Sequence, residues 1–187
     1  DPVLLVARLG LLPRFLAKAT LWNVAPARPL LGFARVIPVH RRADAADGSV
    51  DNRATFASAV AALEDHQIVA IFPEGTTHDD PVIRPLRTGV SRIAVQAAAD
   101  GVDNLAIVPV GVFYEDKVAV RSRALITFGD AIPVDVGPEA LDETGAPDHA
   151  LVDDLTARVT SALRDITPDF ANHEEAIGLT AAARLAQ

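Results

Sequence analysis

The stretch QIVAIFPEGTTHDDPVIRPLRTGVSRIAVQAAA, residues 67–99, joins an apolar run, a turn and a second apolar segment of different period. Residues 67–72 are almost wholly apolar, which is typical of a strand buried on both faces. After Gly89, apolar side chains recur at helical spacing at Val90, Ile93 and Ala97. A buried strand followed by an amphipathic helix predicts an α/β fold whose sheet is covered by helices.

The same alternation continues on both sides of this stretch. Further strands are expected at residues 14–18, 35–39, 105–113 and 118–128. Helices are expected after Asp51, a suitable N-cap, and along residues 151–166, where Pro168 would end the helix. We therefore predict a mixed, mainly parallel sheet sandwiched by helices, with further helices at the C-terminal end.

Length and composition are those of a globular domain. The chain has 187 residues, half of them apolar, and it contains no cysteine, which removes disulfide frameworks and cysteine nucleophiles. Residues 1–135 are predicted to form the α/β core, and residues 136–187 a linker and C-terminal helices that pack on the same domain. The sequence has no run of about 18 consecutive apolar residues, so no membrane span is expected within it.

The charge is unevenly distributed along the chain. The formal net charge is −8, yet residues 1–42 hold seven basic residues and a single acid, Asp1. An acidic protein is a poor candidate for nucleic acid, whereas a basic N-terminal segment suits anionic lipid surfaces or phosphorylated substrates. Arg8, Arg14 and Lys18 lie among apolar residues, an arrangement that fits either an interfacial membrane surface or the ordinary rim of a core.

The turn FPEGTTH follows the strand at residues 67–72. Pro73 has no amide hydrogen and ends the strand ladder, and Gly75 lets the backbone turn without a side-chain clash. Glu74 would then lie at the carboxyl end of a strand, where open α/β sheets bind ligands. Taken alone, Pro-Glu-Gly fits a solvated surface turn equally well.

Two other strand ends carry residues suited to a site. His40, Arg41 and Arg42 follow the strand at residues 35–39, and a guanidinium can bind phosphate with two parallel hydrogen bonds; an ordinary basic turn is the alternative. In IVPVGVFYEDK, Pro109 interrupts a strand. Gly111 allows close approach of another backbone or a ligand, or marks a bulge.

Together and in this order, PRFLAKATLW, IPVHRR, IFPEGTTHDDP and IVPVGV resemble the glycerolipid acyltransferases, the family of glycerol-3-phosphate and lysophosphatidate acyltransferases. The resemblance covers nearly the whole chain, and FPEGT followed by PLRTG is its most specific part. It implies transfer of a fatty acyl group from acyl-CoA to a hydroxyl of glycerol 3-phosphate or dihydroxyacetone phosphate in phospholipid biosynthesis. A lysophosphatidate acceptor and a non-catalytic lipid- or phosphate-binding module are the alternatives.

The resemblance also implies roles for particular residues. The family's first block is a histidine, four residues and an aspartate; Asp1 matches the aspartate, so the histidine base is expected upstream of residue 1. These 187 residues alone are therefore expected to be inactive. By resemblance, Asp1 orients that histidine. The other implied roles are phosphate binding by Arg41, shaping of the acceptor pocket by Glu74, Gly75 and Thr76, and an acyl-donor side at Pro109.

The implied partners are acyl-CoA or an acyl carrier, a glycerol phosphate acceptor and the cytoplasmic face of a membrane, where the protein would be peripheral. No cofactor is expected besides acyl-CoA as co-substrate, and the histidines and carboxylates make no convincing metal set. His149 and Asp154 repeat the spacing of the first block, but they follow the fourth block, so we interpret them as a chance match. A nucleotide-binding transferase is disfavoured because the sequence has no P-loop and no Gly-x-Gly-x-x-Gly turn.

Overall fold

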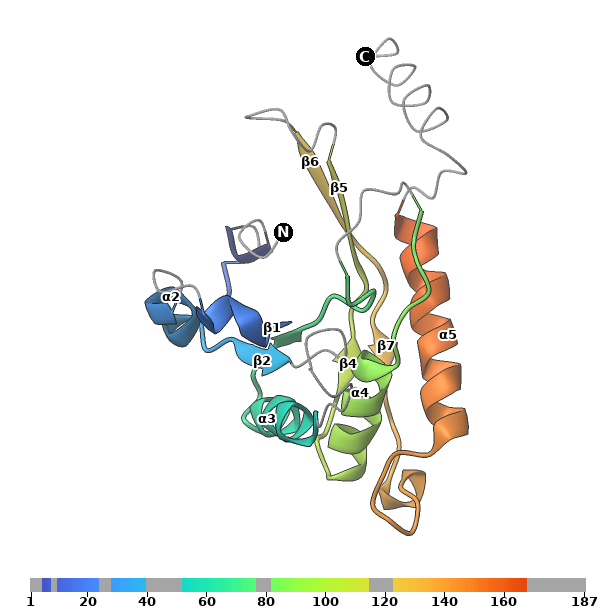
Figure 1. Cartoon of the computed structure of the whole chain (residues 1–187). Coiled ribbons are helices and arrows are strands. Elements are labelled where there is room, and N and C mark those ends of the chain that lie inside the picture. The colour runs from blue at the N-terminus through green and yellow to red at the C-terminus, as the bar shows by residue number, and fades with distance from the viewer. Residues whose placement is uncertain are drawn as a thin grey trace.

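The computed structural model describes residues 5–7, 10–23, 28–39, 52–76, 82–114 and 123–167 (Figure 1). The first half of the chain contains β1 (Arg14–Lys18), the 3-10 turn η1 (Ala19–Asn23), α2 (Arg28–Phe33), β2 (Ile37–Val39), α3 (Arg53–Glu64) and β3 (Val69–Ala70). The second half contains α4 (Gly89–Ala99), β4 (Ala106–Ile107), β5 (Val110–Tyr114), β6 (Ala124–Phe128), β7 (Ile132–Pro133), the 3-10 turn η4 (Pro138–Ala140) and α5 (His149–Ile166).

A parallel sheet of three strands occupies the N-terminal half, in the order β2-β1-β3. The central strand β1 pairs in parallel with both neighbours: Leu16 lies opposite Ile37, and Arg14 lies opposite Val69. Parallel neighbours require a crossover, and α2 and α3 lie in the two connections. This arrangement confirms the predicted mixed α/β architecture and brings the carboxyl ends of the three strands to one edge.

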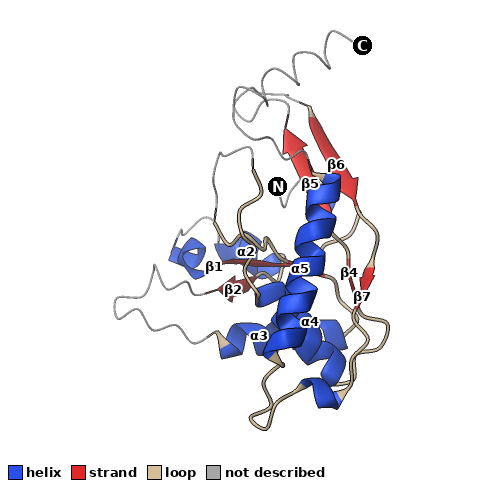
Figure 2. Cartoon of the chain, turned by 90° about the vertical axis from the view of Figure 1, so that its right-hand side faces the viewer, coloured by secondary structure: helices blue, strands red, loops and turns tan. Residues whose placement is uncertain are grey.

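Two antiparallel pairs follow, β4 with β7 and β5 with β6. The predicted strand at residues 105–113 is divided into β4 and β5, and the division falls at Val108 and Pro109. Proline cannot donate to a strand ladder, which explains why it lies at the break. The strands β5 and β6 form a hairpin that extends away from α3 and α4 (Figures 1 and 2). Residues 118–122 of the last predicted strand lie outside the described residues.

Helix α4 is the centre of the molecule, because it contributes to both clusters of buried apolar side chains (Figure 2). Ile93 and Ala97 pack with Ile37 of β2 and with Ala59 and Val60 of α3. The remaining face of α4 packs against α5 and β7, through Ala94, Val95, Ala98, Ala99, Ile132, Leu155 and Val159. The many alanines of α4 leave room for larger side chains on both sides, so one helix can serve two cores.

A pair of hydroxyl groups joins α4 to α5. Ser91 is fully buried, and its Oγ lies 2.7 Å from Oγ1 of Thr156. Thr156 Oγ1 also donates its hydrogen to the carbonyl of Val152 at 2.7 Å. A threonine hydroxyl has one hydrogen, so Ser91 must be the donor in the contact between the two helices. This contact fixes the rotation of α5 about its axis relative to α4.

Asp148 is the N-cap of helix α5 and determines where the helix begins. The side chain of Asp148 accepts hydrogen bonds from the amides of Ala150 and Leu151, at 2.9 and 3.1 Å. The predicted helix at residues 151–166 is therefore present and starts two residues earlier, at His149. Asn52 precedes α3 without a side-chain cap, and Thr55 Oγ1 ties this helix to β2 by donating to the carbonyl of Pro38. The predicted cap Asp51 and the predicted stop Pro168 lie outside the described residues.

Candidate acceptor-binding site

A tight turn follows β3 at the carboxyl edge of the parallel sheet. The amide of Gly75 donates to the carbonyl of Phe72 at 3.1 Å, and Gly75 has a φ of +67°. That value lies in the left-handed region, which glycine reaches without a Cβ clash. Glu74 and Gly75 are half-buried and Thr76 is exposed. The structure thus places Glu74, Gly75 and Thr76 together at the edge where ligands of open α/β sheets bind.

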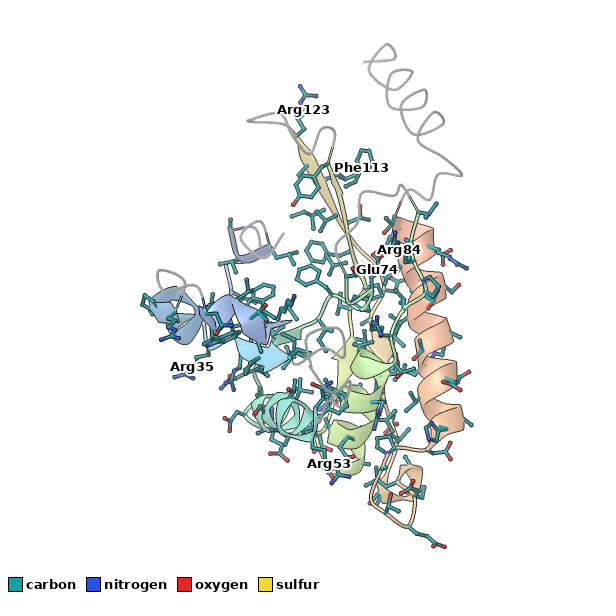
Figure 3. The ribbon with its side chains drawn as sticks, in the orientation of Figure 1. Arg35, Arg53, Glu74, Arg84, Phe113 and Arg123 are labelled. Carbon is teal, nitrogen blue, oxygen red and sulfur yellow. The ribbon has the colours of Figure 1, made fainter. Side chains whose placement is uncertain are left out.

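The segment before α4 lies against this turn and fastens it at two points. The amide of Arg87 donates to the carbonyl of Pro73 at 2.8 Å. The amide of Arg84 donates to Oε2 of Glu74 at 3.3 Å. Figure 3 shows Glu74 and Arg84 side by side. Glu74 therefore has a partner within the chain, and its carboxylate helps to hold residues 84–87 against the turn.

The side chain of Arg87 covers Gly75. A Cβ built on Gly75 would lie 2.7 Å from both Cδ and Nε of Arg87, closer than carbon atoms approach without displacement. Gly75 is therefore needed twice, once for its positive φ and once for the space that Arg87 fills. Arg87 was not predicted as a site residue. The sequence feature that could have indicated its role is the stretch PLRTG, which contains Arg87 and follows FPEGT. The spacing of the two stretches alone does not predict that they are in contact.

The strand that leads into the turn is anchored on β1 by an aromatic pair. The rings of Phe15 and Phe72 are stacked with centroids 6.4 Å apart and planes inclined by 14°. Phe15 is buried within β1 and Phe72 is partly exposed at the start of the turn. This contact adds attraction beyond the buried area and limits movement of residues 72–76 relative to the sheet.

Pro109, predicted on the acyl-donor side, is buried between β4 and β5, and its carbonyl accepts from the amide of Gly129 at 2.9 Å. Beyond it, a Cβ on Gly111 would lie 2.7 Å from Oγ1 of Thr167 and 3.2 Å from the carbonyl oxygen of Ile166. Close approach, one of the two options for Gly111, is therefore the observed one. The end of α5 is the neighbour.

The other predicted site residues fall elsewhere. Asp1, His40, Arg41 and Arg42 lie outside the described residues. His149 is the exposed first residue of α5, and Asp154 lies 4.0 Å from Arg158 one turn further along the helix. Within the described ranges, no cluster of three or more histidine, aspartate, glutamate or cysteine side chains could hold a metal ion.

The sequence model of the Acyltransferase family matches residues 1–113, more than half of the chain. The chain belongs to the acyltransferase family. Glycerol-3-phosphate O-acyltransferase 2 of Saccharomyces cerevisiae is 34% identical over 139 residues, which are 74% of this acyltransferase-family chain and 18% of the yeast protein. Glycerol-3-phosphate O-acyltransferase 1 of the same yeast is 30% identical over 115 residues, 60% of the chain and 15% of that protein.

The acyltransferase-family chain thus spans less than a fifth of the length of these relatives. An uncharacterized acyltransferase of Schizosaccharomyces pombe is also similar, at 36% identity over 67 residues, which are 35% of the chain and 10% of that protein. No solved structure matches the chain. The family match includes β1, β2, β3 and the turn at residues 73–76, so the site described above lies within it.

Substitutions of Glu74 test whether catalysis depends on the hydrogen bond that its carboxylate oxygen accepts from the Arg84 amide or on its negative charge. Glutamine retains an oxygen that can accept from the Arg84 amide, whereas alanine leaves this amide without the side-chain acceptor. We expect Glu74→Ala to lower kcat/KM about tenfold more than Glu74→Gln, as removal of one hydrogen bond to a charged group suggests. Steady-state kinetics of the full-length protein would measure this difference. Equal losses in the two variants would show that the charge, and not the contact with Arg84, is what the site needs.

Proposed function

We propose that the protein containing this chain transfers a fatty acyl group from acyl-CoA to a hydroxyl of glycerol 3-phosphate, with dihydroxyacetone phosphate as an acceptor of the same kind. The observation that carries this proposal is the turn at residues 73–76 held by residues 84–87. It places Arg84, Arg87 and the nearby N-terminus of α4 beside the turn, next to the carboxylate of Glu74. The two guanidinium groups and the positive end of the helix dipole favour a phosphorylated acceptor. The names of the two yeast relatives support the same acceptor.

The reaction needs a base, because a glycerol hydroxyl is a weak nucleophile. The hydroxyl oxygen attacks the thioester carbonyl, the new C–O bond forms as the C–S bond breaks, and coenzyme A leaves as the thiol. A histidine takes the hydroxyl proton and returns it to the leaving sulfur, so protons balance. We assign this histidine to the motif position five residues ahead of Asp1, with Asp1 orienting the ring and stabilising its charged form. Support for both roles comes from the family resemblance.

The acceptor would be held by its phosphate and its hydroxyls. In the sequence, Arg41 comes two residues after the last residue of β2, Val39. We propose that Arg41 binds the phosphate, while Glu74, Gly75 and Thr76 form the wall of the acceptor pocket. Pro109 is assigned to the acyl-donor side on the family resemblance alone.

The long acyl product belongs in a bilayer, and we propose a peripheral position at the cytoplasmic face of a membrane. In the described part of the chain, none of the helices has the length and apolarity needed to span a bilayer. The basic N-terminal segment supports attraction to anionic lipids.

Three acceptors distinguish the proposal from its alternatives. The full-length protein should be assayed with acyl-CoA and glycerol 3-phosphate, dihydroxyacetone phosphate or lysophosphatidate in turn. Turnover with either of the first two supports the proposal, and turnover with lysophosphatidate alone would replace it. Phosphate binding without turnover would identify a non-catalytic module.

Arg41→Ala should chiefly weaken acceptor binding. Loss of a hydrogen bond to a charged group costs about 1.5–3 kcal/mol, so the acceptor KM should rise roughly 10- to 100-fold while kcat falls less. Arg158→Ala is the matched control, because Arg158 is an exposed arginine on α5 that pairs with Asp154 on the same helix. An acceptor KM that does not change in Arg41→Ala would remove Arg41 from the phosphate site.

A further inference from the structure

A second surface lies at the opposite edge of the parallel sheet, where the strands begin. A shallow hollow of about 380 Å³ is lined there by residues from three separate segments. Four of its apolar side chains are unusually exposed: Leu11 at 52%, Leu12 at 50%, Phe33 at 79% and Ile68 at 50%. A single exposed leucine is ordinary, but a group of large apolar side chains on one face marks an interaction surface.

The fold itself brings these side chains together. Leu11 and Leu12 precede β1, Phe33 precedes β2, and Ile68 precedes β3. Because the three strands are parallel, the residues before them meet at the same edge. The amide of Arg14 donates to the carbonyl of Ile68 at 2.8 Å, which fixes two of the segments side by side.

Two arginines also line the hollow. Nε of Arg14 donates to the carbonyl of Arg35 at 3.2 Å, and both side chains lie among the exposed apolar residues. Figure 3 shows Arg35 on the side of the parallel sheet away from Glu74. Among the described residues, no carboxylate lines the hollow, and Glu64 and Asp65 at the end of α3 are not part of its lining. The lining is therefore apolar and cationic.

The ends of two helices at this edge carry unexpected residues. After α2, the amides of Arg35 and Val36 bond back to Gly32 and Leu31; after α3, those of His66 and Gln67 bond back to Leu63 and Ala62. Both are Schellman ends, whose left-handed residue is usually glycine. Here these residues are Arg35, at φ +47°, and His66, at φ +56°, and both line the hollow. Arginine costs more backbone energy than glycine at this position, and its side chain lines the hollow.

We propose that this edge, formed by Leu11, Leu12, Arg14, Phe33, Arg35 and Ile68, binds the surface of an anionic phospholipid bilayer. The apolar side chains would enter the boundary between headgroups and acyl chains, and the guanidinium groups would pair with lipid phosphates. The inference rests on the proposed function, because the product of a glycerolipid acyltransferase partitions into membranes.

The proposal has a consequence for the acceptor. Ile68 lies at the membrane edge, and the chain runs along the strand direction for about four residues before the turn that begins at Phe72, so the acceptor turn would stand up to about 13 Å from the bound surface. That turn then faces water. A water-soluble glycerol phosphate reaches it directly, whereas lysophosphatidate embedded in the same bilayer does not.

Vesicle flotation of the 187-residue chain tests the surface. We expect it to float with phosphatidylcholine vesicles that contain phosphatidylserine and not with phosphatidylcholine alone. Phe33→Ser combined with Leu12→Ser should weaken binding about tenfold or more. Arg35→Gly should weaken it about fivefold, the loss expected for one cation at an anionic surface, while its unfolding midpoint stays equal or rises because the backbone strain is relieved.

Leu125→Ser is the matched control, because Leu125 is 57% exposed on the distant hairpin strand β6. It should float like the unaltered chain. Unchanged flotation of the Phe33 and Leu12 double variant would overturn the proposal, as would a dimer that forms through this edge without vesicle binding. Gly75→Val, which changes neither a charge nor an apolar side chain of this edge, should float normally, so a failed membrane surface and a failed acceptor site give different results.

Discussion

Gly75→Val should lower kcat/KM for acyl transfer by about 100-fold or more in the full-length protein. A β-branched side chain is strained at a φ of +67°, and its Cβ would occupy the space now filled by Cδ and Nε of Arg87. The Arg87 side chain must then leave its place over the turn, or the turn itself must move. Displacement of a substrate-positioning group by about 1 Å is enough to cost roughly 100-fold. Steady-state kinetics with each substrate varied would measure the loss.

Gly145→Val separates the two causes of this effect. Gly145 has a φ of +77°, close to that of Gly75, but a Cβ placed there meets no atom within 4 Å. This control carries the backbone strain without the clash, so it should destabilise the fold slightly and leave catalysis near its normal value. If Gly145→Val and Gly75→Val lost activity equally, the contact between Gly75 and Arg87 would have no special part in the reaction.

Leu155→Ala should destabilise the chain by about 2–5 kcal/mol, the cost of replacing a buried leucine by alanine in a packed core. Leu155 is 4% exposed and lies in the cluster that joins α5 to α4 and β7. A loss of this size is a large part of the stability of a single domain, so the unfolding midpoint in urea should fall sharply.

The exposed neighbour Leu151 provides the comparison on the same helix. Leu151 is 40% exposed, so Leu151→Ala should change the free energy of unfolding by about 0.5 kcal/mol or less. A small loss for Leu155→Ala, similar to that of Leu151→Ala, would mean that α5 contributes little to the fold. It would also count against our proposal that residues 136–187 belong to the same domain as the core.

The strands and helices were predictable where local pattern and burial agree. The strand at Arg14–Lys18 has the predicted bounds, and α4 and α5 follow the predicted apolar periodicity within two residues. Helix α2 and strand β7 were not predicted, because RPLLGF and IP are too short for periodicity to be recognised. The division of residues 105–113 could be located from Pro109, but not the antiparallel partners of its two halves. Those partners depend on residues 124–133, which follow later in the chain.

The position of the acceptor turn was predictable from the sequence, but the contacts that hold the turn were not. Pro73, Glu74 and Gly75 after an apolar strand indicated a turn at the ligand-binding edge, and the structure places it there. What no spacing rule predicts is that residues 84–87 return to the same turn. That contact depends on two hydrogen bonds between residues far apart in the sequence, from the Arg84 amide to the Glu74 carboxylate and from the Arg87 amide to the Pro73 carbonyl. The roles of Asp1 and Arg41 stay predictions.

The hydroxyl pair between α4 and α5 imposes an order on evolutionary drift. Ser91 donates to Thr156, and Thr156 donates to the carbonyl of Val152. Loss of the Ser91 hydroxyl leaves Thr156 with its own bond intact, whereas loss of the Thr156 hydroxyl leaves a buried donor without an acceptor. Relatives that lack both hydroxyl groups are therefore expected to descend through ancestors that changed position 91 first. The two hydroxyl groups are therefore not equivalent in substitution, because Ser91 is the donor and Thr156 the acceptor of their contact.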